Sequence, residues 1–357
     1  MPSTVRIGTR ASTLALTQTG HVADALARLG GFDVEIVHVR TDGDRLTGSL
    51  ATLGGTGVFV TALRDALLDE RCDVAVHSLK DLPTGPADGL VLGAVPPRED
   101  PRDVLCAREG WTLTTLPPGA RVGTGSPRRA AQLRAARPDL DVVNIRGNVD
   151  TRLRRVAPGD LDAVVLARAG LARLGRLDAV TQELDPAVMT SAAGQGALAV
   201  EVRAGVTDPQ LAAALAALDD PASRLAVAAE RALLGHLEAG CAAPVGALAR
   251  LDAAPTDDPA AADARLDGEP GHLLTLDAVV VRTDGTQQLR RSARATLAPE
   301  SPTVDSVTDV PADPRGAGRL VGHVDLERHA AAETLGRTLA EELLDAGAAD
   351  LAELGPR

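Results

Sequence analysis

The sequence predicts an α/β protein, with two α/β domains followed by a smaller C-terminal α+β domain. Short β-branched runs alternate with helical segments from the N-terminus onward, which is the pattern of a mostly parallel sheet covered by helices. The alternation starts again after a Pro-, Arg- and Asp-rich stretch at 96–103. From about residue 219 the pattern changes to a helix, three strands and a final helix. A chain of 357 residues is long enough for two or three such domains.

The first α/β domain is predicted to span 1–98 and to be completed by 196–217. Its first helix has one apolar side and ends at Gly30, and glycine is common where a helix stops. The predicted elements are strands at 5–9, 34–39 and 73–78 and helices at 12–30 and 60–70.

The second α/β domain is predicted to span 99–195, after a hinge in the Pro-rich stretch. The run GQGALAVEV at 194–202 is a further strand, and we expect it to return to the first domain. The other predicted elements are strands at 103–107, 120–124, 141–145 and 162–167 and helices at 127–137, 149–156 and 167–175.

The third domain is predicted to span 218–357 and to mix helices with an antiparallel sheet. Two segments rich in Pro, Asp and Ala, at 252–271 and 299–318, are expected to be surface loops. The predicted elements are helices at 221–240 and 329–347 and strands at 245–250, 273–282 and 287–297.

Composition excludes several classes of function. The net charge of -12 argues against a general polyanion-binding surface, and an aromatic content of 1% leaves few platforms on which nucleic-acid bases could stack. No apolar run is long enough to span a bilayer, and the N-terminus carries no secretory signal. Cys72, Cys106 and Cys241 are an odd number without metal-ligand spacing, which favours a reduced, cytoplasmic protein without a metal site.

Three basic loops share one design, in which a strand ends, a short turn follows and a helix begins. Free backbone N–H groups at a helix start attract anions, and a guanidinium binds a carboxylate or phosphate through two hydrogen bonds. The alternative is that each arginine is a solvated surface charge. The loops are IGTRAST with Arg10 and Ser12, VGTGSPRRAAQL with Ser126, Arg128 and Arg129, and NIRGNVDTRLRRV with Arg146, Asn148 and Arg152.

The stretch VHSLKDLP at 76–83 contains Lys80, the only lysine in the chain, next to Asp81. Asp81 is a candidate carboxylate for stabilising a cationic intermediate or moving protons, with Lys80 holding an anionic ligand. The alternative is a surface ion pair of little energetic value. His77 is expected to be structural, because no second ligand stands at metal-binding spacing, and Cys72 and Cys106 are expected to pack in the core.

Two further stretches have open interpretations. GGTGVF at 54–59 is either a flexible lid or a tight turn, and the sequence slightly favours the turn. Cys241 follows Gly240 and precedes Pro244 in LEAGCAAPVG, beyond an expected helix end. Such a loop gives a thiol the exposure that a nucleophile needs, although a cysteine on a turn is more often incidental.

Taken in order, these segments resemble the porphobilinogen deaminase family, also called hydroxymethylbilane synthases. The resemblance is dense over about the first 250 residues and rests on AVHSLKDLP, IRGNVDTR and GCAAPVG together. It implies two periplasmic-binding-protein-like α/β domains plus a smaller α+β domain carrying the cofactor cysteine. It also implies an enzyme that condenses four porphobilinogen molecules on a covalent dipyrromethane cofactor, with loss of ammonia, and releases hydroxymethylbilane by hydrolysis.

The resemblance also assigns residues. Asp81 is the expected catalytic carboxylate, Cys241 the expected thioether anchor, and Gln195 is expected in an interdomain hinge. Incoming porphobilinogen and the polypyrrole intermediates are the expected partners of a monomer. The expected cofactor contacts are Cys241, Lys80, Asp81, Thr124, Gly125, Ser126, Arg128, Arg129 and Gln195, and the expected substrate contacts are Arg10, Ser12, Arg146, Arg152 and Arg173.

The sequence departs from the family pattern in two places. Thr52 and Thr56 occupy lid positions that are often lysine, so we expect weaker lid contacts or a contribution from Arg45. Gly125 replaces a frequent serine and offers a backbone N–H without a hydroxyl.

The main alternative function is a non-catalytic two-lobed binding protein for a small di-acid. The missing export signal, the placement of Asp81 among basic residues and the cysteine loop count against it.

Overall fold

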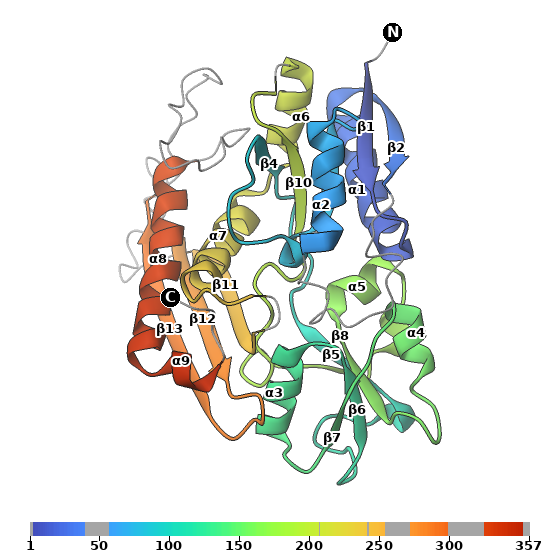
Figure 1. The fold of residues 1–357 in the computed structure, drawn as a ribbon, viewed down its shortest axis with the longest axis vertical. Helices are drawn as coiled ribbons and strands as arrows, with labels where there is room; N and C mark the ends of the chain where they lie inside the picture. Colours follow the sequence, from blue (N-terminus) through green and yellow to red (C-terminus); the bar gives the residue numbers. More distant parts are fainter. Residues whose placement is uncertain are drawn as a thin grey trace, which may run out of the picture.

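A computed structural model describes residues 3–39, 57–206, 208–240, 243–253, 272–298 and 325–352. It contains three sheets, which occupy separate parts of the molecule (Figure 1). Two are five-stranded and carry helices, and the third is a three-stranded antiparallel sheet packed against two long helices. The predicted class, two α/β units followed by a smaller α+β unit, is therefore confirmed. Within the described part of the chain, no helix has the length and apolar character required to cross a membrane.

The first sheet has the order β2-β1-β3-β10-β4 and is mixed rather than mostly parallel. β1 runs parallel to β2 and β3, whereas β10 runs antiparallel to both β3 and β4. The expectation of a mostly parallel sheet is wrong here because β10 arrives from the second sheet, more than a hundred residues later, and enters in the opposite direction. The elements of this unit are β1 (Thr4–Thr9), α1 (Thr13–Gly30), β2 (Asp33–His38), α2 (Gly57–Leu68), β3 (Val74–Ser78), β4 (Leu90–Ala94), β10 (Leu198–Arg203) and α6 (Pro209–Leu218).

The second sheet has the order β7-β6-β8-β5-β9 and repeats the mixed design. β6 runs parallel to β7 and β8, and β5 runs antiparallel to β8 and β9. The carboxyl ends of the parallel strands carry two of the basic loops. The elements are β5 (Asp103–Ala107), β6 (Arg121–Thr124), α3 (Pro127–Ala136), β7 (Asp141–Asn144), α4 (Val149–Arg154), β8 (Ala163–Ala167), α5 (Arg168–Arg173) and β9 (Gln182–Glu183).

The third sheet is a meander of three antiparallel strands. α7 and α8 pack against each other and against the sheet, and both contribute to one apolar core. α7 ends at His236, earlier than the predicted Gly240, and Glu238 then adopts a positive φ of 51°. The elements are α7 (Pro221–His236), β11 (Val245–Ala253), β12 (His272–Val281), β13 (Gln288–Leu297), α8 (Leu326–Asp345) and α9 (Ala348–Leu351).

The chain passes between the first and second sheets twice, and the two crossing segments are hydrogen-bonded to each other. The Glu99 N–H donates to the Gly196 carbonyl at 3.3 Å, and the Ser191 hydroxyl donates to the Pro101 carbonyl at 2.7 Å. Gly196 has a φ of +88°, and a Cβ there would lie 2.2 Å from the Glu99 oxygen. The close approach of the two crossings therefore depends on a glycine.

Glu230, on α7, fastens the third sheet to both crossings. Its side chain is fully buried and accepts two hydrogen bonds from Arg98, at 2.7 and 3.1 Å. It also accepts from the Gly194 N–H at 2.6 Å and from the Ala249 N–H at 2.8 Å. One carboxylate thus joins both crossing segments to β11, and its burial is compensated by charge and hydrogen bonds.

Candidate active site

Lys80 and Asp81 occupy a short 3-10 turn, η2 (Leu79–Asp81), directly after β3. Leu79 is fully buried, which places its two polar neighbours at the carboxyl end of the strand. Asp81 is partly buried, and no described residue forms a hydrogen bond with its carboxylate. The carboxyl edge of an open α/β sheet is a usual place for ligands.

Lys80 lies in a partly buried position close to Gln195 and the second basic loop. Its Nζ is 3.4 Å from the Gln195 Oε1. Burial and the charges of Arg129 and Arg128 together lower the Lys80 pKa to about 8, although Asp81 and Asp103 act in the opposite direction. A lysine held among arginines is a group that gains stability from an added anion.

The three basic loops have the predicted construction. The Ser12 hydroxyl caps α1 by accepting from the Ala15 N–H at 3.3 Å. Ser126 caps α3, with Pro127 in the first turn, and Asn148 caps α4. Each loop therefore follows the carboxyl end of a strand and begins a capped helix.

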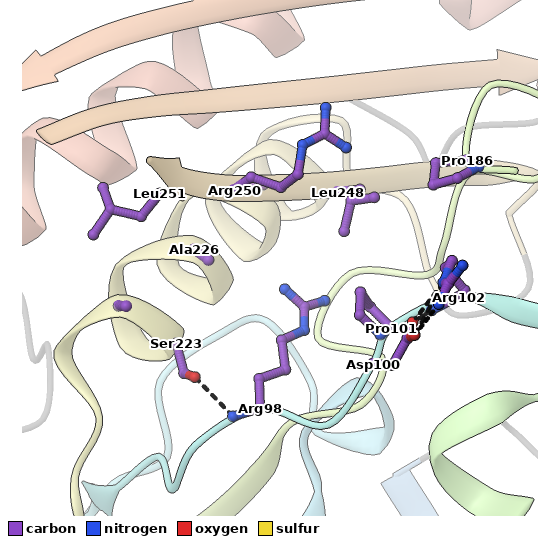
Figure 2. A pocket seen from close by; sticks show the side chains of 12 residues that line it. Arg98, Asp100, Pro101, Arg102, Pro186, Ser223, Ala226, Leu248, Arg250 and Leu251 are labelled. Carbon is purple, nitrogen blue, oxygen red and sulfur yellow. Dashed lines mark hydrogen bonds and ion pairs between the residues drawn. The ribbon is translucent and has the colours of Figure 1, made fainter. Parts of the chain in front are cut away.

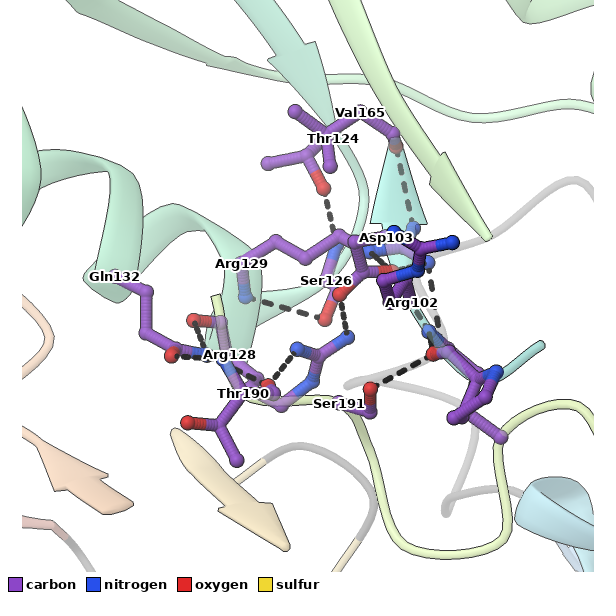
Figure 3. A network of polar contacts seen from close by, with 12 residues as sticks. Arg102, Asp103, Thr124, Ser126, Arg128, Arg129, Gln132, Val165, Thr190 and Ser191 are labelled. Carbon is purple, nitrogen blue, oxygen red and sulfur yellow. Dashed lines mark hydrogen bonds and ion pairs between the residues drawn. The ribbon is translucent and has the colours of Figure 1, made fainter. Parts of the chain in front are cut away.

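Arg128 and Arg129 are buried rather than solvated, and they share one carboxylate that the sequence did not single out (Figure 3). Asp103 has no exposed surface and lies 2.8 Å from the Arg128 Nη2 and 2.7 Å from the Arg129 Nη2. Burial alone would raise the Asp103 pKa, but the two arginines outweigh it and hold that pKa at about 2. Asp103 is the last residue of REDPRD and begins the buried strand β5, and a charged residue at the start of a buried strand is a signal that the sequence analysis missed.

Gln195 lies on the second crossing between the sheets and joins this group to Lys80. Its amide nitrogen donates to Asp103 at 2.8 Å and to the Pro101 carbonyl at 2.7 Å. Its amide oxygen lies 3.4 Å from both the Lys80 Nζ and the Arg129 Nη2.

Gly125 has a packing reason to lack a side chain. A Cβ at this position would lie 2.6 Å from the Ile145 carbonyl oxygen, a backbone atom that cannot easily move. The nearest side-chain atom is the Arg152 Nη2, at 3.7 Å from that Cβ. The glycine therefore lets the second and third basic loops approach each other. Thr124 is buried and accepts a hydrogen bond from the Ser126 N–H at 3.2 Å.

Arg152 belongs to the same group of charges. Burial lowers its pKa first, and the nearby Arg129 and Arg146 lower it further. Its Nε donates to the Gly147 carbonyl at 2.8 Å, and Arg146 itself is exposed. Several mutually repelling cations in a partly buried region fit a ligand that carries several carboxylates.

Arg173 lies apart from this group, at the chain crossing. Its Nη2 donates to the Gly196 carbonyl at 2.6 Å. Burial lowers its pKa while Glu99 opposes that effect, and its side chain lines a separate cavity of 630 Å³ with His21 and Arg28.

A cavity of 360 Å³ lies between the first chain crossing and the third sheet (Figure 2). Its cationic side chains already have acidic partners: Arg98 binds Glu230, Arg102 binds Asp100, and Arg250 binds Asp277. Neither Lys80 nor Asp81 lines this cavity, so it is separate from the basic group.

Cys72, Cys106 and His77, which the sequence analysis expects to be structural, are all buried. Cys72 and Cys106 are buried free thiols, and burial raises the pKa of both. His77 is buried, with its Nε2 3.1 Å from the Glu201 carboxylate. Across the described ranges no cluster of metal-ligating side chains occurs.

Several predicted residues lie outside the described part of the chain: Cys241, Thr52, Thr56, Arg45 and most of the two acidic segments. Gly240 and Ala243, which flank the Cys241–Ala242 pair, are joined by a hydrogen bond of 2.9 Å from the Ala243 N–H to the Gly240 carbonyl. The site of the cysteine therefore lies between the end of α7 and the start of β11.

Comparison with solved structures gives likenesses over about three fifths of the chain. A lipoprotein of the YaeC family from Enterococcus faecalis overlaps with 60% of this chain and 91% of its own, at 17% identity and a TM-score of 0.35. A methionine-binding protein overlaps with the same shares at 12% identity and a TM-score of 0.39.

Two family models match most of the chain, and relatives cover nearly all of it. Residues 5–211 match the model of the porphobilinogen deaminase dipyrromethane cofactor-binding domain, and 224–305 match the porphobilinogen deaminase C-terminal domain. A porphobilinogen deaminase from Leifsonia xyli subsp. xyli is 54% identical, over 98% of this chain and 94% of its own. One from Cutibacterium acnes is 52% identical, over 99% and 98%. This chain therefore belongs to the porphobilinogen deaminase family.

Proposed function

We propose that this chain condenses four porphobilinogen molecules head to tail, releases an ammonia at each addition and then frees hydroxymethylbilane by hydrolysis. The observation that carries this proposal is the partly buried Asp81 carboxylate beside Lys80 and the group of arginines. Each pyrrole carries an acetate and a propionate, so a chain of pyrroles needs many cations in one place. The overall charge of -12 makes that concentration of arginine a local feature.

Asp81 is the proposed catalytic residue. Departure of ammonia from porphobilinogen leaves a cationic methylene-pyrrole, and a fixed carboxylate next to it lowers the energy of that cation. The neighbouring arginines and Lys80 bind the acetate and propionate groups of the substrate. Asp81 is then the carboxylate that lies next to the cationic methylene-pyrrole and stabilises it. Asp81 can also accept a pyrrole N–H hydrogen bond and so orient the ring.

The dipyrromethane cofactor supplies the primer on which the pyrrole chain is extended. Cys241 is its proposed thioether anchor, because GCAAPVG resembles the family pattern and a thiol can act as a nucleophile. The lowered pKa values of Lys80 and Arg152 fit a group with several carboxylates. The proposed cofactor contacts are Lys80, Asp81, Thr124, Gly125, Ser126, Arg128, Arg129 and Gln195.

Incoming substrate is proposed to meet the arginines farther from Asp103. Exposed Arg146 and the half-buried Arg152 stand on the loop after β7 and on α4. Arg10 and Ser12 follow β1, which pairs with β3 and therefore ends at the same edge of the sheet as Lys80. Arg173 completes this set from the chain crossing.

We also propose the domain division 1–98 with 196–217, 99–195, and 218–357. The distribution of strands among the three sheets supports it. A cytoplasmic monomer is the proposed form, and the two buried free thiols support a reducing compartment.

The test is the intact mass of the purified native protein. We expect two extra pyrrole units, and we expect Cys241→Ala to lack them. An unmodified mass on active protein would contradict the covalent primer. An unmodified mass on inactive protein that binds a small di-acid would favour the two-lobed binding protein instead.

A further inference from the structure

We propose that Asp103 is a positioning residue for the proposed cofactor contacts: it is the resident counter-ion that holds Arg128 and Arg129 in place and, through Gln195, joins them to Lys80. This inference rests on the proposed function, because it concerns how the chain prepares for a ligand rich in carboxylates.

The geometry gives Asp103 a full set of partners. One oxygen accepts from the Arg128 Nη2 at 2.8 Å, and the other accepts from the Arg129 Nε at 2.9 Å. The second oxygen also accepts from the Gln195 amide at 2.8 Å. All three donors approach within ordinary hydrogen-bond distance, and the carboxylate has no exposed surface left for a ligand. Asp103 therefore acts through its neighbours and does not touch the substrate.

The arginines need this carboxylate because they are nearly as buried as it is. Arg128 and Arg129 keep only 4% and 5% of their surface exposed. Arg128 also donates to the Thr190 carbonyl, and Arg129 donates to the Val165 carbonyl at 3.2 Å. Two buried guanidinium groups without a counter-ion would repel each other at a large desolvation cost. The negative charge of Asp103 offsets that repulsion and fixes the positions of both guanidinium groups in the absence of a ligand.

The same carboxylate acts on a lysine from the other domain. The charged groups that act most strongly on Lys80 are Arg129, Asp81, Asp103 and Arg128. The arginines disfavour a protonated Lys80, whereas Asp81 and Asp103 favour it. If Asp103 lost its charge, the two arginines would stay and the balance would move against the ammonium form. Lys80 would then lose its proton at lower pH and bind carboxylates over a narrower pH range.

The experiment measures cofactor loading by mass and not turnover. Full-length protein made without porphobilinogen is incubated with porphobilinogen from pH 6.5 to 9.5, and the rate of gain of two pyrrole units is followed by intact mass. Wild type should load well at neutral pH and lose its loading rate with a midpoint near the Lys80 pKa of about 8. Asp103→Asn should load roughly tenfold more slowly at pH 7.5, and its midpoint should fall by about half a pH unit or more.

Glu230→Gln is the matched control. Glu230 is equally buried and binds Arg98 with both oxygens, but it is not among the main charges acting on Lys80. Both variants should lower the melting temperature, since Asp103→Asn leaves two buried arginines and Glu230→Gln leaves one without a counter-ion. Only Asp103→Asn should move the midpoint.

Three results would overturn the inference: an Asp103→Asn profile identical to wild type, an equal midpoint shift in Glu230→Gln, or a wild-type profile that stays flat to pH 9.5. The flat wild-type profile would overturn the inference even if Asp103→Asn does not fold, because it is measured on the wild-type protein. Wild-type protein that gains no pyrrole mass at any pH would instead refute the proposed function.

Discussion

Leu79 shows how one apolar residue can place two polar ones. It is fully buried in a small core with Val60, Leu82 and Ala197, while its neighbours Lys80 and Asp81 stay only partly buried. Hydrophobic packing thus fixes the first residue of the 3-10 turn, while its two charged residues remain partly accessible. The sequence predicts Lys80 and Asp81 as candidates because they are neighbours within the short motif VHSLKDLP.

Asp81→Asn should keep the cofactor and bind substrate but turn over at least a hundredfold more slowly. The amide is nearly isosteric and lacks the negative charge that stabilises the cation left by ammonia. Intact mass checks cofactor loading, and single-turnover kinetics check the chemical step. Asp88→Asn, an exposed acid in the same loop region, serves as the control and should be normal. Near-wild-type turnover would remove Asp81 from its role.

Arg146→Leu should raise the KM for porphobilinogen about tenfold with a smaller change in kcat. Arg146 is an exposed residue near Arg152, and we propose that it binds the carboxylates of incoming substrate. Steady-state kinetics give both constants. Arg154→Leu removes an exposed arginine from α4 and should leave the KM unchanged. Equal behaviour of the two variants would make Arg146 an ordinary surface charge.

At the scale of elements, Gly196→Ala should destabilise the protein by about 1–3 kcal/mol, since an added Cβ meets the Glu99 oxygen. Gly205→Ala is the control that separates the cost of a positive φ from the cost of the steric clash with Glu99. Gly205 also has a positive φ, of +77°, but open space surrounds its position. Denaturant unfolding should show the larger loss at Gly196. Equal losses would mean that backbone strain alone, and not the approach of the two crossings, sets the cost.

The elements that the sequence predicted well are those with local signals. The caps at Ser12, Ser126 and Asn148 lie where the residue types placed them, because a cap depends on its own first turn. α6 was missed although Asp208 caps it and Pro209 begins it, which are ordinary start signals.

What the sequence could not give is long-range pairing. The antiparallel entry of β10 and the short strands β4 and β9 depend on partners far along the chain. The role of Asp103 depends on Arg128, Arg129 and Gln195, which come from three other segments. An acid in a strand gives no local sign of which cations it will meet.

At the scale of the whole molecule, buried carboxylates set the response to acid. The pKa of Asp103 and that of Glu201 are each about 2, against ordinary values of 3.8 and 4.5. Burial opposes both shifts; Arg128 and Arg129 outweigh it at Asp103, and His77 and Arg64 outweigh it at Glu201.

Both groups therefore contribute stability that is fully present above about pH 4.5 and is lost as the pH falls toward 2. The melting temperature should fall across this window, and Glu201→Gln should make the fall shallower from a lower starting value. Scanning calorimetry at several pH values checks this. Exposed Glu342→Gln should leave the profile unchanged, and a Glu201→Gln profile parallel to wild type would contradict the assignment.

The place of β10 between β3 and β4 also bears on how the protein is made. On the ribosome, the strands of the first sheet emerge early, but β4 has no neighbour until Leu198–Arg203 has been synthesised. The second sheet is built from one unbroken stretch of chain and can form in the meantime. The nascent protein is therefore expected to complete its second sheet first. The first sheet stays incomplete until β10 has been translated and can pair with β3 and β4.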